Sequence, residues 1–123
     1  KIARSILSAL GKEIYFADED YINMATALSG SGPAYVFLFI EALTDAGVNI
    51  GLSCKDAQEL ALQTILGSAE MVKKVGKHPA ELRNMVTSPG GTTAAALAQL
   101  EKGGFRSSIL EAVVAAYEKA RRL

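Results

Sequence analysis

The sequence lacks several features that would mark a specialised class of protein. It has no tryptophan, and its one cysteine, Cys54, excludes an internal disulfide bond. A single unpaired cysteine fits a reducing compartment, and we expect a cytoplasmic location. The 13 basic and 13 acidic residues give a formal net charge of zero. Because nucleic-acid-binding proteins normally carry a basic excess, we expect no nucleic-acid partner.

Long apolar segments and clusters of metal ligands are also scarce. The longest apolar run, Ala34 to Ile40, is too short to cross a bilayer. The first ten residues lack the apolar stretch and cleavage site of a signal peptide. We therefore expect no membrane association. The scattered Cys, His, Asp and Glu residues show no metal-ligand spacing, and we expect no metal site.

The length and composition favour one helical domain with large apolar faces. The chain has 123 residues, of which 50% are hydrophobic. A domain of this length buries roughly two-thirds of its unfolded surface and needs neither disulfides nor metals. Alanine is abundant, and small side chains allow helices to approach closely. We predict an all-α fold.

Residues 1–20 differ from the rest of the chain. Apolar residues at helical spacing precede Gly11, and residues 13–17 then read as a short strand. One helix and one strand cannot bury both of their faces. We expect residues 1–20 to be the end of an α/β domain, and residues 21–123 to form a separate helical domain. The acidic residues 18–20 would serve as linker and cap.

The helical domain divides at glycines, prolines and capping residues. Residues 34–40 are apolar on every side, so that helix must be buried all round. In a domain this small, such burial indicates a second copy of the chain. Gly67, inside a helix, is typical of a close helix crossing. The expected helices are Tyr21 to Ser29 capped by Asp20, Pro33 to Ala46 stopped by Gly47, a helix from the Ser53 cap to Gly76, Pro79 to Val86, Thr93 to Glu101, and Ser108 to Arg122.

The most informative segment is Thr-Ser-Pro-Gly-Gly-Thr-Thr, residues 87–93, which passes from a loop into a helix. The first N–H groups of a helix have no intrahelical partner and lie at its positive end. Gly90 and Gly91 would let a carboxylate or phosphate approach those groups closely. Thr92 and Thr93 add hydroxyl groups. Capping alone also selects Pro, Gly and Thr at helix starts, so both interpretations stand at this point.

Several motifs resemble one known family, pyrroline-5-carboxylate reductase, over nearly the whole chain. They agree with it in order and spacing. They are Ala-Leu-Ser-Gly-Ser-Gly-Pro-Ala-Tyr at 27–35, Gly-Val-Asn-Ile-Gly-Leu at 47–52, Ser-Pro-Gly-Gly-Thr-Thr at 88–93, and Leu-Glu-Lys-Gly-Gly-Phe at 100–105.

The resemblance implies an enzyme that reduces 1-pyrroline-5-carboxylate to proline with NAD(P)H. It implies a nucleotide-binding domain followed by a helical domain that interlocks with a second copy into a homodimer, and dimers that can assemble further. No Gly-x-Gly-x-x-Gly fingerprint follows a strand here, so we expect no cofactor-binding residues in this sequence. The chain alone would then be inactive.

The resemblance also assigns roles within the glycine loop. Ser88, Gly90, Gly91, Thr92 and Thr93 would bind the substrate, with the amides of the last three holding its carboxylate. The Thr93 hydroxyl would reach the ring nitrogen and act in catalysis. The competing interpretations are a helical dimerisation module without activity and the helical domain of another dehydrogenase. For the second, no comparable Gly-x-x-x-Lys signature lies within an expected helix, because the spacing from Gly51 to Lys55 runs across the expected cap at Ser53.

Other candidates have simpler structural explanations. His78, the only histidine, precedes Pro79 and is expected to cap a helix or lie at the surface. Cys54, near a helix start, has no histidine partner nearby in sequence. The pair Glu41 and Asp45 and the basic clusters at 73–77 and 121–122 are expected to be solvated or salt-bridged.

Overall fold

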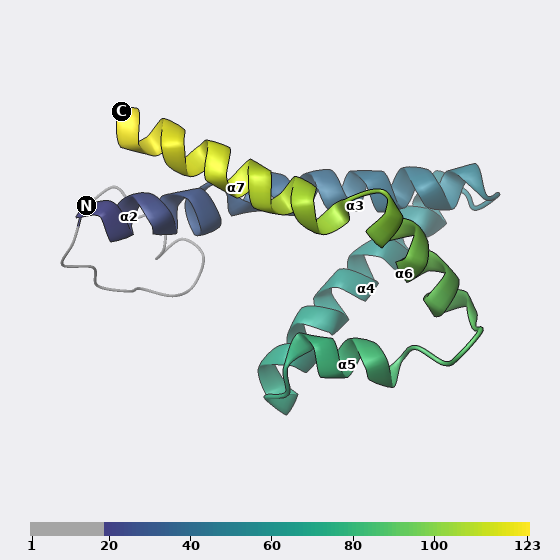
Figure 1. Ribbon diagram of the computed structural model, residues 1–123. Helices are drawn as coiled ribbons and strands as arrows, with labels where there is room; N and C mark the ends of the chain where they lie inside the picture. Colours follow the sequence, from purple (N-terminus) through teal and green to yellow (C-terminus); the bar gives the residue numbers. More distant parts are fainter. Residues whose placement is uncertain (1–18) are drawn as a thin grey trace. The chain divides into compact units, whose positions relative to one another are not determined.

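The computed structural model of the chain describes residues 19–123, which are helical almost throughout and contain no strand (Figure 1). The expected all-α fold is confirmed for this range. The helix expected within residues 1–10 and the strand at 13–17 lie outside it. The elements are α2 (Glu19–Ala25), the π-helical turn η1 (Thr26–Gly30), α3 (Gly32–Asn49), α4 (Cys54–Val75), α5 (Pro79–Met85), α6 (Thr92–Lys102) and α7 (Phe105–Arg122).

The helices belong to two compact units. The first holds α2, η1, the beginning of α3 and α7, and the second holds the remainder of α3 with α4, α5 and α6. In the first unit α2, η1 and α7 all contact one another (Figure 1).

The helix expected from Tyr21 to Ser29 begins at Glu19 and changes its winding at Thr26. The Ser31 N–H donates to the Thr26 carbonyl at 2.8 Å, the wider spacing of a π-helix. Ala27 is buried in this turn, and its carbonyl accepts a 2.7 Å hydrogen bond from the Tyr35 hydroxyl. The Gly-Ser-Gly-Pro segment therefore leads from the π-helical turn η1 into α3, and the Tyr35 hydroxyl bonds α3 back to that turn.

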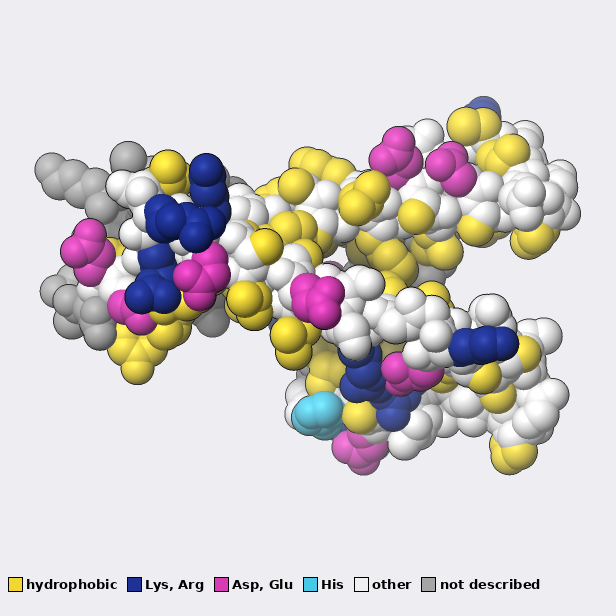
Figure 2. All heavy atoms as spheres, turned by 45° about the horizontal axis from the view of Figure 1, so that its top comes forward, with side chains coloured by type: hydrophobic (Ala, Val, Ile, Leu, Met, Phe, Trp, Pro, Cys, Tyr) yellow, Lys and Arg dark blue, Asp and Glu magenta, His cyan; other side chains and the backbone are white. Residues whose placement is uncertain are grey.

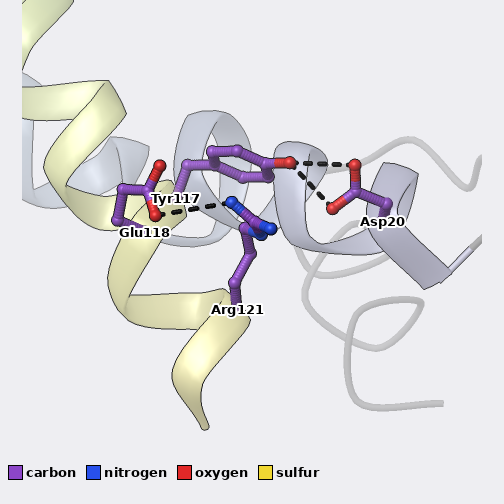
Figure 3. Close-up of polar contacts among 4 residues, drawn as sticks. All are labelled: Asp20, Tyr117, Glu118 and Arg121. Atoms are coloured by element: carbon purple, nitrogen blue, oxygen red, sulfur yellow. Dashed lines mark hydrogen bonds and ion pairs between the residues drawn. The ribbon is translucent and has the colours of Figure 1, made fainter.

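Asp20 is not the expected N-cap, because it lies inside the first turn of α2. Both of its carboxylate oxygens accept from the Tyr117 hydroxyl on α7, each at 2.8 Å (Figure 3). The Arg121 guanidinium lies 5.5 Å from the centre of the Tyr117 ring. Arg121 also pairs with Glu118 at 3.5 Å. This Asp20–Tyr117 contact joins residues 97 positions apart in the chain.

The second unit confirms most of the expected helix ends. Ser53 caps α4 by accepting from the Asp56 N–H at 3.1 Å. Gly76 ends α4 in a left-handed conformation, with φ of 75°. His78 caps α5, because its Nδ1 accepts from the Ala80 N–H at 3.0 Å. Leu82 is the buried residue of α5.

Gly47 does not stop α3, which continues to Asn49, so the boundary expected at Ala46 was wrong. A Cβ atom at Gly47 would lie 2.9 Å from the Cβ of Ala57 on α4. The glycine is required by close packing rather than by a helix end. At Gly67, by contrast, a Cβ would have no atom from another described element within 4 Å. The helix crossing expected at Gly67 is therefore not made by the described residues.

The chain buries little apolar surface by itself. The buried hydrophobic residues are Ala27, Ala57, Ala61 and Leu82, and Thr44 is buried with no hydrogen-bond partner for its hydroxyl among the described residues. Phe37 and Leu38 on α3 are 67% and 66% exposed. Apolar side chains accordingly occupy much of the visible surface (Figure 2). The all-round burial expected for residues 34–40 is not provided by the rest of residues 19–123.

The continuous helical stretch Glu19–Asn49, of 31 residues, is long and apolar enough to cross a membrane by length and composition alone. The expectation that no apolar segment is long enough to cross a bilayer rested on Ala34 to Ile40 alone, but the apolar helical stretch extends well beyond that run. The core helix of a soluble protein meets the same criterion.

We expect Tyr117→Phe to destabilise the first unit, because it removes the hydroxyl that bridges α7 to α2. Hydrogen bonding to Asp20, then burial and the charge of Asp20, raise the pKa of Tyr117 above its ordinary value of 10.0. A raised folded-state pKa means that this stabilisation is complete below about pH 10 and is lost as pH rises through the folded-state value. Melting temperatures of both proteins at pH 7–11 test this. A gap between the proteins that does not narrow at alkaline pH would contradict it.

We expect Gly47→Ala to lower the free energy of unfolding by about 1–3 kcal/mol, the usual range for overpacking. Gly67→Ala is the matched control, since alanine is favoured there by up to about 1 kcal/mol and meets no atom of another described element. Chemical denaturation measures both. Equal effects would refute the packing argument at Gly47, and a destabilising Gly67→Ala would indicate that a second chain covers that face.

Candidate functional site

The loop between α5 and α6 is held at both of its ends. The Thr87 N–H donates to the Asn84 carbonyl at 3.2 Å, and the Thr87 hydroxyl donates to the Arg83 carbonyl at 2.6 Å. At the other end the Gly91 N–H donates to the Ser88 carbonyl at 3.1 Å, closing a tight turn. The main chain therefore enters α6 along a defined path.

The two glycines of the loop serve different purposes. Gly90 has a φ of 71°, a left-handed conformation that is unfavourable for other residues. Gly91 is extended, with φ of −85° and ψ of −179°, so its backbone suits any residue. It is restricted by space instead, because a Cβ there would lie 2.6 Å from the Ser88 Oγ and 3.3 Å from the Ser88 carbonyl oxygen.

The start of α6 is left open on its amide side. Gly91 is the N-cap and supplies no side-chain hydrogen bond, and the first turn contains no acidic residue. Helices α4 and α5 differ, since each has a capping side chain and an acid in its first turn. Within the described residues, the amides of Thr92, Thr93 and Ala94 have no acceptor, and the ladder begins with the Ala95 N–H bonded to the Gly91 carbonyl.

One of the three amides expected to bind a carboxylate is not available in this geometry. The Gly91 N–H already donates to the Ser88 carbonyl inside the turn, whereas the amides of Thr92 and Thr93 have no acceptor among the described residues. The Ala94 amide also has no acceptor and is not among the expected donors, although every helix start leaves several successive amides without partners.

The residues of the predicted site follow one another along the loop and the first turn of α6. Ser88, Gly90 and Thr92 are exposed, whereas Gly91 and Thr93 are half-buried. The segment 87–93 contains no charged residue. An anion here would therefore be held by backbone N–H groups, hydroxyl groups and the positive end of the α6 dipole.

The other candidate residues take the structural roles expected of them where the contacts are defined. His78 is the α5 cap, and Lys74 pairs with Glu70 at 3.5 Å. Cys54 is exposed at the first position of α4. Within residues 19–123, no three His, Cys, Asp or Glu side chains gather in a way that could hold a metal ion.

Comparison with known proteins gives this helical chain its family. Residues 19–123 match the family described as pyrroline-5-carboxylate reductase dimerisation. The chain therefore belongs to this family.

Named relatives agree over almost the whole chain. It is 54% identical over 121 residues to the pyrroline-5-carboxylate reductase of Synechocystis, and 54% identical over 122 residues to that of Arabidopsis thaliana. These matches cover 98% and 99% of this chain but only 45% and 44% of the relatives. The chain thus spans less than half the length of the proteins it matches.

Solved structures support the same assignment. A pyrroline-5-carboxylate reductase from Coxiella burnetii superposes with a TM-score of 0.88 and 44% identity, over 98% of this chain and 45% of the other. The Plasmodium falciparum pyrroline carboxylate reductase with NADP bound gives a TM-score of 0.86 and 49% identity, over 89% of this chain and 42% of that one.

We expect Gly91→Ala to destabilise the protein by about 1–3 kcal/mol, because the new methyl group would press on Ser88. In a Ser88→Ala background the atom at 2.6 Å is gone and the nearest remaining contact is at 3.3 Å, so the effect should shrink. A double-mutant cycle by chemical denaturation measures this coupling. Strictly additive effects would show that Ser88 does not limit the space at Gly91.

Proposed function

We propose that this chain is the dimerisation and substrate-binding part of a reductase that converts 1-pyrroline-5-carboxylate to L-proline with NAD(P)H. The observation that carries the proposal is the open amide row at the start of α6. Family membership supplies the reaction, since the relatives are named for it. The substrate's carboxylate is the anion that the loop would hold.

The carboxylate would be bound by the amides of Thr92, Thr93 and Ala94, which have no acceptor among the described residues. Gly90 and Gly91 carry no side chain to block its approach, and no acidic residue in the first turn competes for the positive helix end. The Gly91 amide could join the clamp only by giving up its bond to Ser88. Ser88 is exposed beside the turn and can donate a further hydrogen bond.

Thr93 is the residue we assign to catalysis. It lies half-buried in the first turn of α6, and its hydroxyl can donate to or accept from the ring nitrogen of a substrate anchored by its carboxylate. Orienting the C=N bond this way reduces the entropy that the reaction must lose, which is worth several kcal/mol in favourable cases. The hydroxyl can also pass a proton to the nitrogen.

NAD(P)H supplies the hydride in this reaction. The described residues contain no strand followed by a Gly-x-Gly-x-x-Gly turn, the usual dinucleotide site. We therefore assign cofactor binding to a part of the enzyme outside this sequence. The role of the present chain is to anchor and orient the substrate.

We further propose that a second copy of the chain covers the exposed apolar faces of α3 and α7. Phe37, Leu38 and Leu110 are each more than 60% exposed, the last at 64%, and the family is one of dimerisation domains. Obligate dimers bury more than about 2,000 Å² of largely apolar surface. A protein partner also accounts for the apolar stretch Glu19–Asn49 without a membrane, and we place the protein in an aqueous compartment such as the cytoplasm.

We expect Thr93→Ala in the full-length enzyme to lower kcat by about tenfold or more and to leave the dimer intact, because only the hydroxyl is lost. Thr93→Ser keeps a hydroxyl and should retain most of the activity. Steady-state kinetics with NADPH, beside sedimentation, give both readouts. Unchanged turnover in Thr93→Ala would remove Thr93 from the mechanism.

We expect the protein to sediment as a dimer or larger species at micromolar concentration without detergent. Phe37→Glu should weaken this association by introducing a charge into the covered face, whereas Lys55→Glu on the exposed surface of α4 should not. A folded monomer for the unchanged protein, or solubility only in detergent, would contradict the proposed interface.

The alternative is a helical dimerisation module in which the glycine loop only caps α6. The abundance of uncovered apolar surface would fit such a module equally well. Titration with proline separates the two possibilities. A thermal shift that Gly91→Val abolishes supports the carboxylate site, and the absence of any shift in a correctly assembled dimer favours the module.

A further inference from the structure

The cap of α5 works only while His78 is neutral. Its Nδ1 accepts the Ala80 N–H at 3.0 Å, which requires a lone pair on that nitrogen. Protonation would place a hydrogen on Nδ1 and a positive charge at the positive end of the helix. Both changes oppose the observed geometry, and the exposed imidazole is open to solvent protons.

The other end of α5 holds the glycine loop. Thr87 is tied to the last turn of α5 through its N–H to Asn84 and its hydroxyl to Arg83. The helix has only seven residues, too few to be stable by itself in water. Besides its cap, the buried Leu82 anchors it. The start of the loop is therefore tied to the last turn of this short helix, whose first turn is held by the His78 side chain and by the Glu81 and Leu82 N–H bonds to the His78 carbonyl.

We propose that His78 is a proton-sensitive cap, whose protonation loosens α5 and with it the anchored start of the Thr87–Gly91 loop. The proposal concerns the conformation of the loop and does not require that the loop bind a substrate.

The charged surroundings of His78 are mainly basic. Lys73 and Lys74 lie in the last turn of α4, Lys77 directly precedes the histidine, and Glu81 lies in the first turn of α5. Lys74 is already paired with Glu70. Within the described residues, the imidazole makes no hydrogen bond or ion pair other than that with Ala80, so no carboxylate holds the protonated form in place.

Hydrogen–deuterium exchange with mass spectrometry on the assembled protein tests the proposal. Protection of peptides covering residues 78–86 and 87–93 is compared at pH 5.5 and 7.5, after correction for the intrinsic exchange rate. We expect protection of both peptides to fall by about fivefold at the lower pH, the effect of losing a typical N-cap. A peptide from the middle of α4 should not change.

Two variants make the outcome decisive. His78→Asn keeps a capping side chain that does not titrate, so its protection should be equal at both pH values. His78→Ala should show low protection at both. The proposal is overturned if the unchanged protein keeps its protection at pH 5.5, or if His78→Asn loses it to the same extent.

Discussion

Burial of apolar surface is the constraint on which the rest of this structure depends. Each unit contains long helices with apolar faces, yet among residues 19–123 the buried hydrophobic side chains are three alanines and Leu82. A fold with so few buried groups has little hydrophobic stabilisation of its own, since that term scales with the area removed from water. The family to which the chain belongs is defined by dimerisation, and a second copy is the natural source of the missing contacts.

The glycine loop is a potential anion site because the helix that follows it lacks a capping side chain and an acidic residue in its first turn. α4 and α5 satisfy their first amides with Ser53 and His78, and each adds an acid in the first turn. α6 has neither. Its N-cap is Gly91, where a larger residue would collide with the nearby Ser88 side chain. The result is a row of donors beside a defined turn, with no charged group within residues 87–93.

Sequence patterns predicted most helix ends because these depend on local chemistry, although α7 begins at Phe105 rather than at the expected Ser108. Ser53, Gly76 and His78 act within a few residues of themselves, and all three were identified. Gly47 was misread because its reason is the Cβ of Ala57, a contact between two helices that spacing alone does not reveal. Asp20 was misread for a similar reason, since its partner Tyr117 is distant in the chain.

The residue types of the loop and the resemblance to the reductases predict a binding site at its glycines and threonines, and that assignment stays a prediction. The sequence did not predict which backbone amides lack an acceptor. The use of the Gly91 amide within the turn was not predicted, because it depends on how Ser88 and Gly91 fold back on each other. The geometry of the turn determines which amides lack an acceptor, and the residue types alone do not reveal that geometry.

The contact between Asp20 and Tyr117 fastens the second residue of α2 to a residue near the end of α7 (Figure 3). The first and the last helix of the described residues are therefore held together by one pair of side chains. A truncation of α7 that removed Tyr117 would release this attachment of α2, a helix at the opposite end of the described sequence. Two helices separated along the chain by all the other described elements thus share one point of attachment.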